Sequence, residues 1–175
     1  MALLVAGAGI VALRPAAERL VPSPPSASVQ TSQNGWPEIT SGHDPRLQPF
    51  PWVTGSVLAG DVHKVLEHVA ERFDREVEPI DVASSWGWAH RPVRGGSALS
   101  NHASGTAVDF NATRHPLGAT GTFTGEQVAV IRSILEDVAP AVTWGGDFEG
   151  RKDEMHFEIS AEPDVVAAVA ARLTS

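Results

Sequence analysis

Two histidines and one aspartate have the residue types and the spacing of a metal site. His102 and Asp109 flank the short segment SNHASGTAVDF (residues 100–110), and His156 lies much later, in MHFEI (residues 155–159). Two imidazoles and a carboxylate suit an open catalytic zinc site, in which a fourth position is left for water or substrate. The metal lowers the pKa of a bound water to about 7, so hydroxide forms without a strong base. The alternative is that the three residues are unrelated polar positions.

Strand alternation would bring these side chains together. If residues 155–159 form a strand, its apolar residues point into a core and His156 points to the opposite face. In a second expected strand, residues 106–110, the same alternation places Asp109 on the polar side beside a small alanine. We therefore expect both side chains on one shared face, with His102 on the loop that leads into it.

The periodicity of the remaining sequence predicts the elements that must hold this face. Three amphipathic helices are expected, starting at Asp61, Thr124 and Pro163. Four short strands are expected, at residues 80–84, 106–110, 141–145 and 155–159. Together they predict an α+β domain with a small, mainly antiparallel sheet and flanking helices.

The composition removes several classes of function. The chain has 175 residues, a length that suits one domain with a hydrophobic core, and we expect a monomer. Its 13 basic and 21 acidic residues give a formal charge of -8 without a basic cluster, so nucleic acid is not an expected partner. The lack of cysteine and tyrosine excludes thiolate metal sites, cysteine nucleophiles and phenolic catalysts.

The N-terminal segment has the composition of a signal peptide or a membrane anchor. Residues 2–13 are an uninterrupted apolar run of the length of a signal-peptide core, although no positive charge precedes it. Residues 14–35 are rich in proline and serine, as linkers are. We therefore expect a segment at 1–35 that directs export or membrane association, and a folded domain at 36–175. An ordinary N-terminal helix is the alternative.

Two motifs resemble the paired signature of a peptidase family. SNHASGTAVDFN (residues 100–111) and WGGDFEGRKDEMHFEI (residues 144–159) are similar to motifs of the zinc D-alanyl-D-alanine carboxypeptidase and L-alanyl-D-glutamate peptidase family. This family includes VanY-like enzymes and phage endolysin peptidases. The resemblance extends over about residues 33–160 and implies the hedgehog/DD-peptidase fold, an α+β domain.

The resemblance implies roles for the residues of these motifs. It makes His102, Asp109 and His156 the zinc ligands. It makes Asp153, three residues before the last histidine, the general base and then the general acid. Strict strand alternation instead places Glu154 on the side of the last histidine, whereas a strand that begins after Glu154 leaves Asp153 in the preceding turn and favours it as the base.

Further side chains are expected around the ligands. The resemblance implies an arginine that stabilises the oxyanion, and the match falls on Arg91, with Arg94 as the nearby alternative. Glu158 is expected to fix the imidazole two residues before it. Ser100 is expected to orient the turn or a ligand, and Trp144 to form core or cleft wall, or to contact substrate.

The function that the resemblance implies is hydrolysis of peptidoglycan stem peptides by a zinc metallopeptidase at the bacterial cell wall. The segment RPVRGGSALSNH (residues 91–102) resembles the endolysin-like branch, which favours an L-alanyl-D-glutamate endopeptidase. A D-alanyl-D-alanine carboxypeptidase shares the metal motif and is the alternative. An alternative of another class is a non-catalytic zinc-binding or wall-binding module. We expect an exported or membrane-anchored protein, encoded by a bacterium or a phage.

Overall fold

The computed structural model describes residues 30–174, which form an α+β domain, as expected. The apolar run at 2–13 and its expected targeting role lie outside these residues. The helices are α1 (Asp61–Glu76), α2 (Gly125–Asp137) and α3 (Pro163–Leu173). The strands are β1 (Leu47–Pro49), β2 (Ser56–Leu58), β3 (Ala107–Asp109), β4 (Val142–Trp144) and β5 (His156–Ile159). Three single-turn 3-10 helices are η1 (Val82–Ser84), η2 (Asn101–Ser104) and η3 (Gly145–Asp147).

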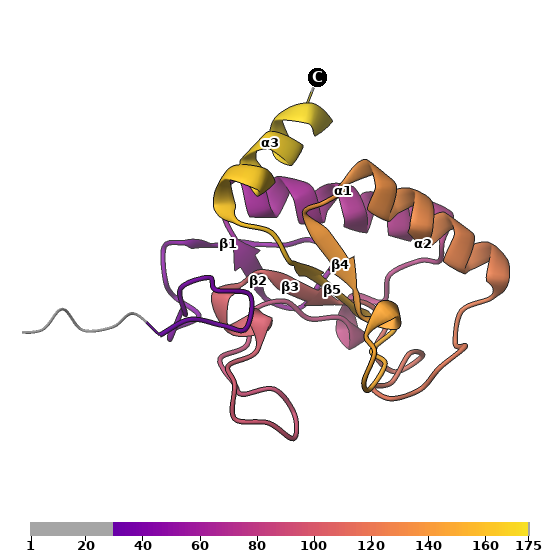
Figure 1. The fold of residues 1–175 in the computed structure, drawn as a ribbon, viewed down its shortest axis with the longest axis horizontal. Helices are drawn as coiled ribbons and strands as arrows, with labels where there is room; N and C mark the ends of the chain where they lie inside the picture. Colours follow the sequence, from indigo (N-terminus) through magenta and orange to yellow (C-terminus); the bar gives the residue numbers. More distant parts are fainter. Residues whose placement is uncertain (1–29, 175) are drawn as a thin grey trace, which may run out of the picture.

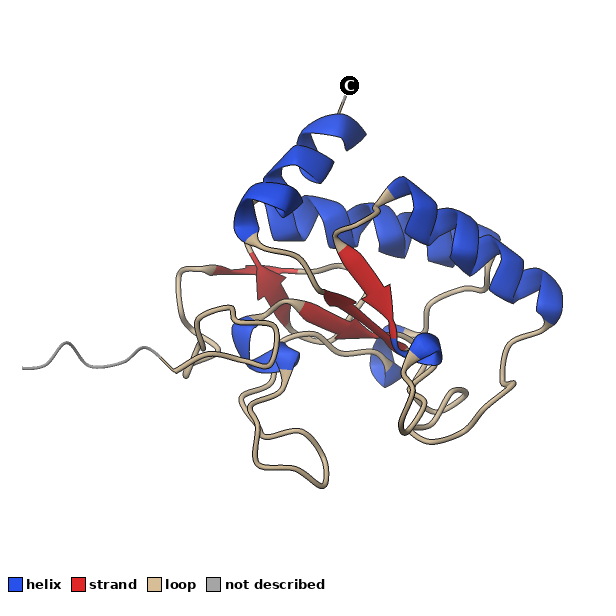
Figure 2. Cartoon of the chain, viewed as in Figure 1, coloured by secondary structure: helices blue, strands red, loops and turns tan. Residues whose placement is uncertain are grey.

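A three-stranded antiparallel sheet, in the order β3-β5-β4, is the centre of the fold. The helices lie on one side of it, at the top of Figure 1, and the long loops extend from the other side (Figures 1 and 2). The register pairs Asp109 with His156 and Ala107 with Glu158. Because paired residues of adjacent strands point to the same face, the two polar side chains share the loop side of the sheet, as alternation predicted.

The opposite face of the sheet packs into an aromatic core. Phe110 and Phe157 are fully buried, with ring centroids 5.5 Å apart, and Phe73 of α1 lies 5.1 Å and 5.8 Å from them. Burying one such side chain contributes roughly 1.5–3 kcal/mol, so these rings hold α1 and the sheet firmly together. The strands that carry the polar site therefore rest on a rigid core.

The three helices were located correctly from their sequence patterns. α2 begins with the predicted capping box, in which Thr124 accepts from the backbone N–H of Gln127 and the glutamine side chain accepts from that of Thr124. The strand predicted at residues 80–84 is wrong. The Asp81 carboxylate accepts from the backbone of Ala83 and from the hydroxyl of Ser84, and this local capping favours the turn η1 over a strand.

The small sheet of β1 and β2 was not predicted, because its two strands have only three residues each and show no clear alternation. Among residues 30–174, no helix combines the length and the apolar character needed to cross a membrane.

Two residues of the expected linker, Ser32 and Asn34, pack against the domain. The Ser32 hydroxyl lies 2.7 Å from that of Ser104, and the Asn34 side chain donates to Thr106 Oγ1 and to the carbonyl of Ile159, both at 2.8 Å. These contacts put ordered structure before the expected domain start at Trp36. The linker composition gave no sign of it, because every partner is distant in the sequence.

Candidate metal centre

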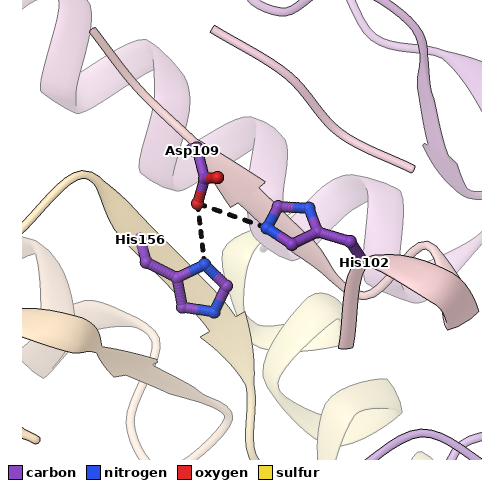
Figure 3. Close-up of side chains that lie close together, drawn as sticks. All are labelled: His102, Asp109 and His156. Atoms are coloured by element: carbon purple, nitrogen blue, oxygen red, sulfur yellow. Dashed lines mark hydrogen bonds and ion pairs between the residues drawn. The ribbon is translucent and has the colours of Figure 1, made fainter. Parts of the chain in front are cut away.

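The structure brings the three predicted metal ligands together on the loop side of the sheet (Figure 3). His102 lies in η2, Asp109 ends β3 and His156 begins β5. One ligand atom from each lies within 4.8 Å of the others, and all three residues are buried. Asp109 Oδ1 is 3.2 Å from His102 Nε2 and 2.7 Å from His156 Nδ1. The three side chains could therefore hold one metal ion.

The tautomer of His102 is fixed by the backbone. Its Nδ1 lies 2.7 Å from the carbonyl oxygen of Gly87, and because a carbonyl can only accept, Nδ1 carries the proton. Its Nε2 faces the site, is buried, and lies 3.2 Å from Asp109 Oδ1 without making a hydrogen bond within the described residues. A buried acceptor without a donor is costly. A metal ion bound at Nε2 would satisfy this acceptor, so the three residues fit the expected zinc ion.

Gly87 itself is required by close packing. A Cβ at this position would lie 2.4 Å from the carbonyl oxygen of Ser56, the first residue of β2. The loop can therefore approach closely enough for its carbonyl to reach His102 only if residue 87 lacks a side chain.

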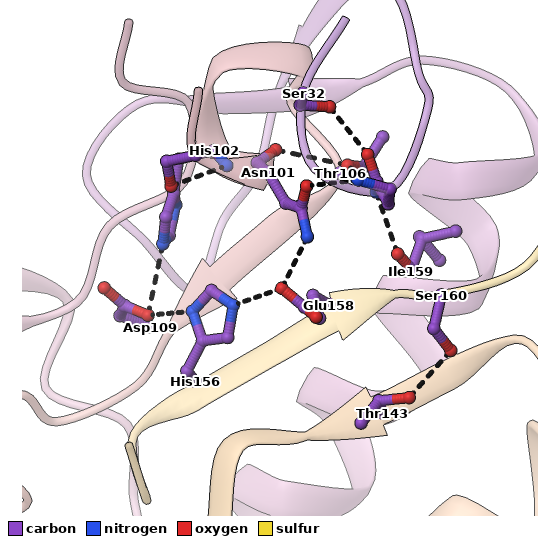
Figure 4. A network of polar contacts seen from close by, with 12 residues as sticks. Ser32, Asn101, His102, Thr106, Asp109, Thr143, His156, Glu158, Ile159 and Ser160 are labelled. Carbon is purple, nitrogen blue, oxygen red and sulfur yellow. Dashed lines mark hydrogen bonds and ion pairs between the residues drawn. The ribbon is translucent and has the colours of Figure 1, made fainter. Parts of the chain in front are cut away.

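His156 is held between two carboxylates (Figure 4). Its Nε2 lies 2.8 Å from Glu158 Oε2, which also accepts from the Asn101 side chain at 2.6 Å. Burial favours the neutral imidazole, but the hydrogen bonds to Asp109 and Glu158 outweigh it and raise the pKa of His156 to about 10. Glu158 thus contacts the imidazole that it was expected to fix, at the ring nitrogen that points away from the other two candidate ligands.

Asp109 has a partner that sequence reasoning missed. Trp86 Nε1 donates to Asp109 Oδ2 at 2.6 Å, and the two residues also exchange backbone hydrogen bonds. Burial opposes ionisation of Asp109, but the charges and hydrogen bonds of His102 and His156 hold its pKa well below the ordinary range. The carboxylate is therefore a charged and oriented candidate ligand. The contact depends on the isolated β-bridge between Trp86 and Asp109. No local sequence pattern indicates this pairing, so the contact could not be predicted from the sequence.

A cavity of about 730 Å³ opens over the three ligands. Asp153 lines it, and its buried Oδ1 has no hydrogen-bond partner among residues 30–174. Burial, and then the negative charge of Asp109, raise the pKa of Asp153 to about 6. Glu154 does not line the cavity, because its carboxylate accepts from the backbone of Gly121 and from the backbone and hydroxyl of Thr122. Of the two candidate bases, Asp153 is thus the one that faces the ligands.

Comparison with known families agrees with this geometry. Residues 94–159 match the family model described as D-alanyl-D-alanine carboxypeptidase. The chain is similar to that peptidase family over this segment. The match covers more than a third of the chain and includes all three ligands and Asp153, so the resemblance stated from the motifs is confirmed. Members of this carboxypeptidase family are hydrolytic enzymes. Neither the curated proteins nor the solved structures gave a significant match.

Three further residues that were expected around the ligands also line the cavity. Arg91, Arg94 and Ser100 do so, and Ser100 caps η2 by accepting from the backbone N–H of His102 at 3.4 Å. Trp144 does not line it: the indole is 3% exposed and donates to the carbonyl of Glu154 at 2.7 Å. Of the roles considered for Trp144, the structure supports the core position and not the substrate contact.

The WGG motif of the family is explained by a close approach of two turns. A Cβ on Gly145 would lie 2.3 Å from the carbonyl oxygen of Asp153, and the carbonyl of Gly145 accepts from the Asp153 backbone N–H at 3.1 Å. The glycine thus lets η3 pack directly against the turn that carries Asp153. Arg151, on the same turn, also lines the cavity and was not predicted.

Proposed function

We propose that the protein is a zinc metallopeptidase that hydrolyses stem peptides of peptidoglycan. The observation that carries this proposal is the buried Nε2 of His102, which makes no hydrogen bond within the described residues, set beside Asp109 and His156 and under a cavity that Asp153 also lines. Imidazole and carboxylate donors suit zinc, whereas magnesium and calcium prefer oxygen ligands alone. A bound zinc ion supplies Lewis-acid chemistry, polarising an amide carbonyl and lowering the pKa of water.

The residues of the chain supply the remaining chemistry. Asp153 takes a proton from the attacking water and passes it to the leaving amine, and a pKa raised to about 6 suits a group that must do both. Arg91 lines the cavity and donates to the oxygen that becomes negative in the transition state. Glu158 and the carbonyl of Gly87 hold the two imidazoles in their orientations.

Two bonds are candidates for cleavage. The resemblance of residues 91–102 to the endolysin-like branch favours the L-alanyl-D-glutamate bond within the stem peptide. The description of the matched family favours the terminal D-alanyl-D-alanine bond. Digestion of purified cell wall, followed by mass spectrometry of the new termini, distinguishes them. Release of free D-alanine without new internal termini would reject the endopeptidase.

Zinc content and wall hydrolysis should be measured side by side in four proteins: wild type, His156→Ala, Asp153→Asn and Glu149→Gln. Glu149 is exposed on the loop before Asp153 and does not line the cavity, so its variant controls for the loss of one negative charge. We expect His156→Ala to lose both zinc and activity. Asp153→Asn should keep zinc and lose about 100-fold or more of the activity, the usual size of a general-base effect.

The same experiment tests the alternative of a binding module. Wild-type protein that carries zinc and binds the wall tightly, but releases no new termini, would support a non-catalytic module. Protein that takes up no zinc and cuts nothing would contradict both.

We also propose that residues 1–35 bring the enzyme to the cell envelope, as a signal peptide or a membrane anchor. The support is the apolar run at 2–13, followed by a linker-like composition. Deletion of residues 2–13 should move the protein from the envelope fraction to the cytosol, and an unchanged envelope fraction would contradict the proposal.

A further inference from the structure

Three arginines line the cavity without a carboxylate partner: Arg91, Arg94 and Arg151. Within residues 30–174 the side chains of Arg91 and Arg94 make no hydrogen bond or ion pair, and Arg151 donates only to a backbone carbonyl. Elsewhere in the described chain, Arg172 donates to the backbone carbonyls of Asp137 and Ala139. The other five arginines there are paired with carboxylates: Arg46, Arg72, Arg75, Arg114 and Arg132. Thus all three arginines that line the cavity lack a carboxylate partner.

Arg151 is held in position across the cavity. Its guanidinium donates to the carbonyl of Arg94 at 2.6 Å, which joins the turn before β5 to the loop before η2. Both loops lie on the side of the sheet away from the helices (Figure 1). The aliphatic part of Arg151 also passes over Gly118, where a Cβ would be 3.5 Å from its Cδ. The contact with the carbonyl engages only one of the five N–H groups of the guanidinium.

The charge of the whole chain makes this cluster unusual. Exposed arginines are ordinarily solvated and need no partner, and Arg94 and Arg151 are both exposed. In a chain with 21 acidic and 13 basic residues, however, the long-range field repels anions. In the lining of the cavity, by contrast, three arginines without a carboxylate partner offset the three carboxylates of Asp109, Asp153 and Glu158. Guanidinium groups bind carboxylates through paired, charge-assisted hydrogen bonds.

We propose that Arg94 and Arg151 bind a free carboxylate of the substrate peptide and so select for acidic stem peptides over amidated ones. The inference rests on the proposed function, since it names the substrate class of the same site. Arg91 keeps its separate role at the oxyanion. Two carboxylates of a stem peptide have this chemistry: the C-terminal carboxylate, and the free carboxylate of the D-glutamate residue.

The test measures binding of intact peptide, so that it does not depend on cleavage. Zinc-loaded Asp153→Asn protein is titrated in a calorimeter with three synthetic stem peptides. One has both carboxylates free, one has an amide in place of the free carboxylate of D-glutamate, and one has a C-terminal amide. The titrations are repeated with Arg94→Gln and Arg151→Gln added to the same background. Arg75→Gln is the matched control, because Arg75 is a surface residue paired with Glu76.

We expect each cavity variant to raise the Kd of the free-acid peptide by about 10-fold, the loss of one charge-assisted contact of about 1.4 kcal/mol. One of the two amidated peptides should already bind that much more weakly to the parent protein, and the variants should not weaken it further. The identity of that peptide assigns the carboxylate. Arg75→Gln should leave every Kd unchanged.

If the cavity variants weaken the binding of all three peptides equally, the inference is overturned, because the arginines would then not recognise a particular carboxylate. An equal loss of affinity in the control Arg75→Gln would overturn the inference as well, because the effect would then come from the net charge of the protein. If wild-type enzyme cleaves none of the peptides but the selective pattern of binding appears, the proposed hydrolysis fails and the inference stands. If peptides are cleaved without the pattern, only the inference fails.

Discussion

The indole nitrogen of Trp86 lies 2.6 Å from Oδ2 of Asp109, while Oδ1 of the same carboxylate faces both histidines. One oxygen of the carboxylate therefore binds a structural partner, and the other faces the candidate metal position. A tryptophan N–H can only donate, so it holds Oδ2 without competing for the metal. Trp86 thus orients the only carboxylate among the three ligands, from a loop that the sequence does not connect with β3.

Replacing Trp86 with phenylalanine should weaken zinc binding. The substitution keeps an aromatic ring and removes the donor, so Asp109 loses the partner that orients it. Loss of such a partner lowers metal affinity by about 10–100-fold. Competition with a chromogenic chelator measures the affinity. Trp52→Phe is the control, since Trp52 packs on Phe50 away from the cavity. Equal zinc affinity in both variants would show that the indole hydrogen bond has no role.

The activity should fall in acid as Asp153 becomes protonated. Its pKa is raised to about 6 by burial and by the charge of Asp109, and a protonated carboxyl cannot accept a proton from water. We therefore expect kcat/KM to rise with pH through about 6 and then to level off. A pH profile of hydrolysis at saturating zinc measures this. If the small residual activity of Asp153→Asn keeps the same acid limb, the limb belongs to another group.

Glu154 should stabilise the fold at neutral pH and contribute less in acid. Burial opposes its ionisation, but hydrogen bonds from Thr122 and Gly121 lower its pKa below the ordinary 4.5. A carboxyl whose pKa is lower in the folded chain stabilises above its unfolded value, and the stabilisation disappears as pH falls through the folded value. Glu154→Gln should cost about 1–3 kcal/mol at pH 7, because an amide cannot satisfy the same donors.

Denaturant unfolding of both proteins from pH 7 to pH 3 tests this. The difference between wild type and Glu154→Gln should shrink steadily below about pH 4.5. A difference that stays constant across this range would mean that packing, and not charge, accounts for the loss.

Gly145→Ala should damage the site, whereas Gly150→Ala should not. A methyl group at residue 145 would lie 2.3 Å from the carbonyl oxygen of Asp153, but at residue 150 it would meet nothing within 4 Å. Forcing in such a group costs about 1–3 kcal/mol and moves the neighbouring backbone. We expect Gly145→Ala to lower both the midpoint of thermal unfolding and kcat. Two variants of equal activity would show that the turn of Asp153 tolerates displacement.

The sequence by itself determined which residues are the candidate metal ligands and which elements carry them. His156 and Asp109 share a face because period-two alternation with Phe157 and Phe110 is a local property of a strand, and the paired register followed from it. The capping box at Thr124 and the start of α3 at Pro163 could also be predicted from local sequence, because a helix end depends on a few adjacent residues. The family motif then agreed with the position of every ligand.

Only the tertiary structure decided what surrounds the ligands. It distinguished Asp153 from Glu154 because the partners of Glu154 lie more than thirty residues away, at Gly121 and Thr122. It also joined Trp86 to Asp109 and Arg151 to the cavity, and packed residues of the expected linker against η2. These relationships depend on loops that meet across the sheet. A loop has no repeating pattern of its own, so its neighbours are fixed by packing and long-range hydrogen bonds and not by local sequence.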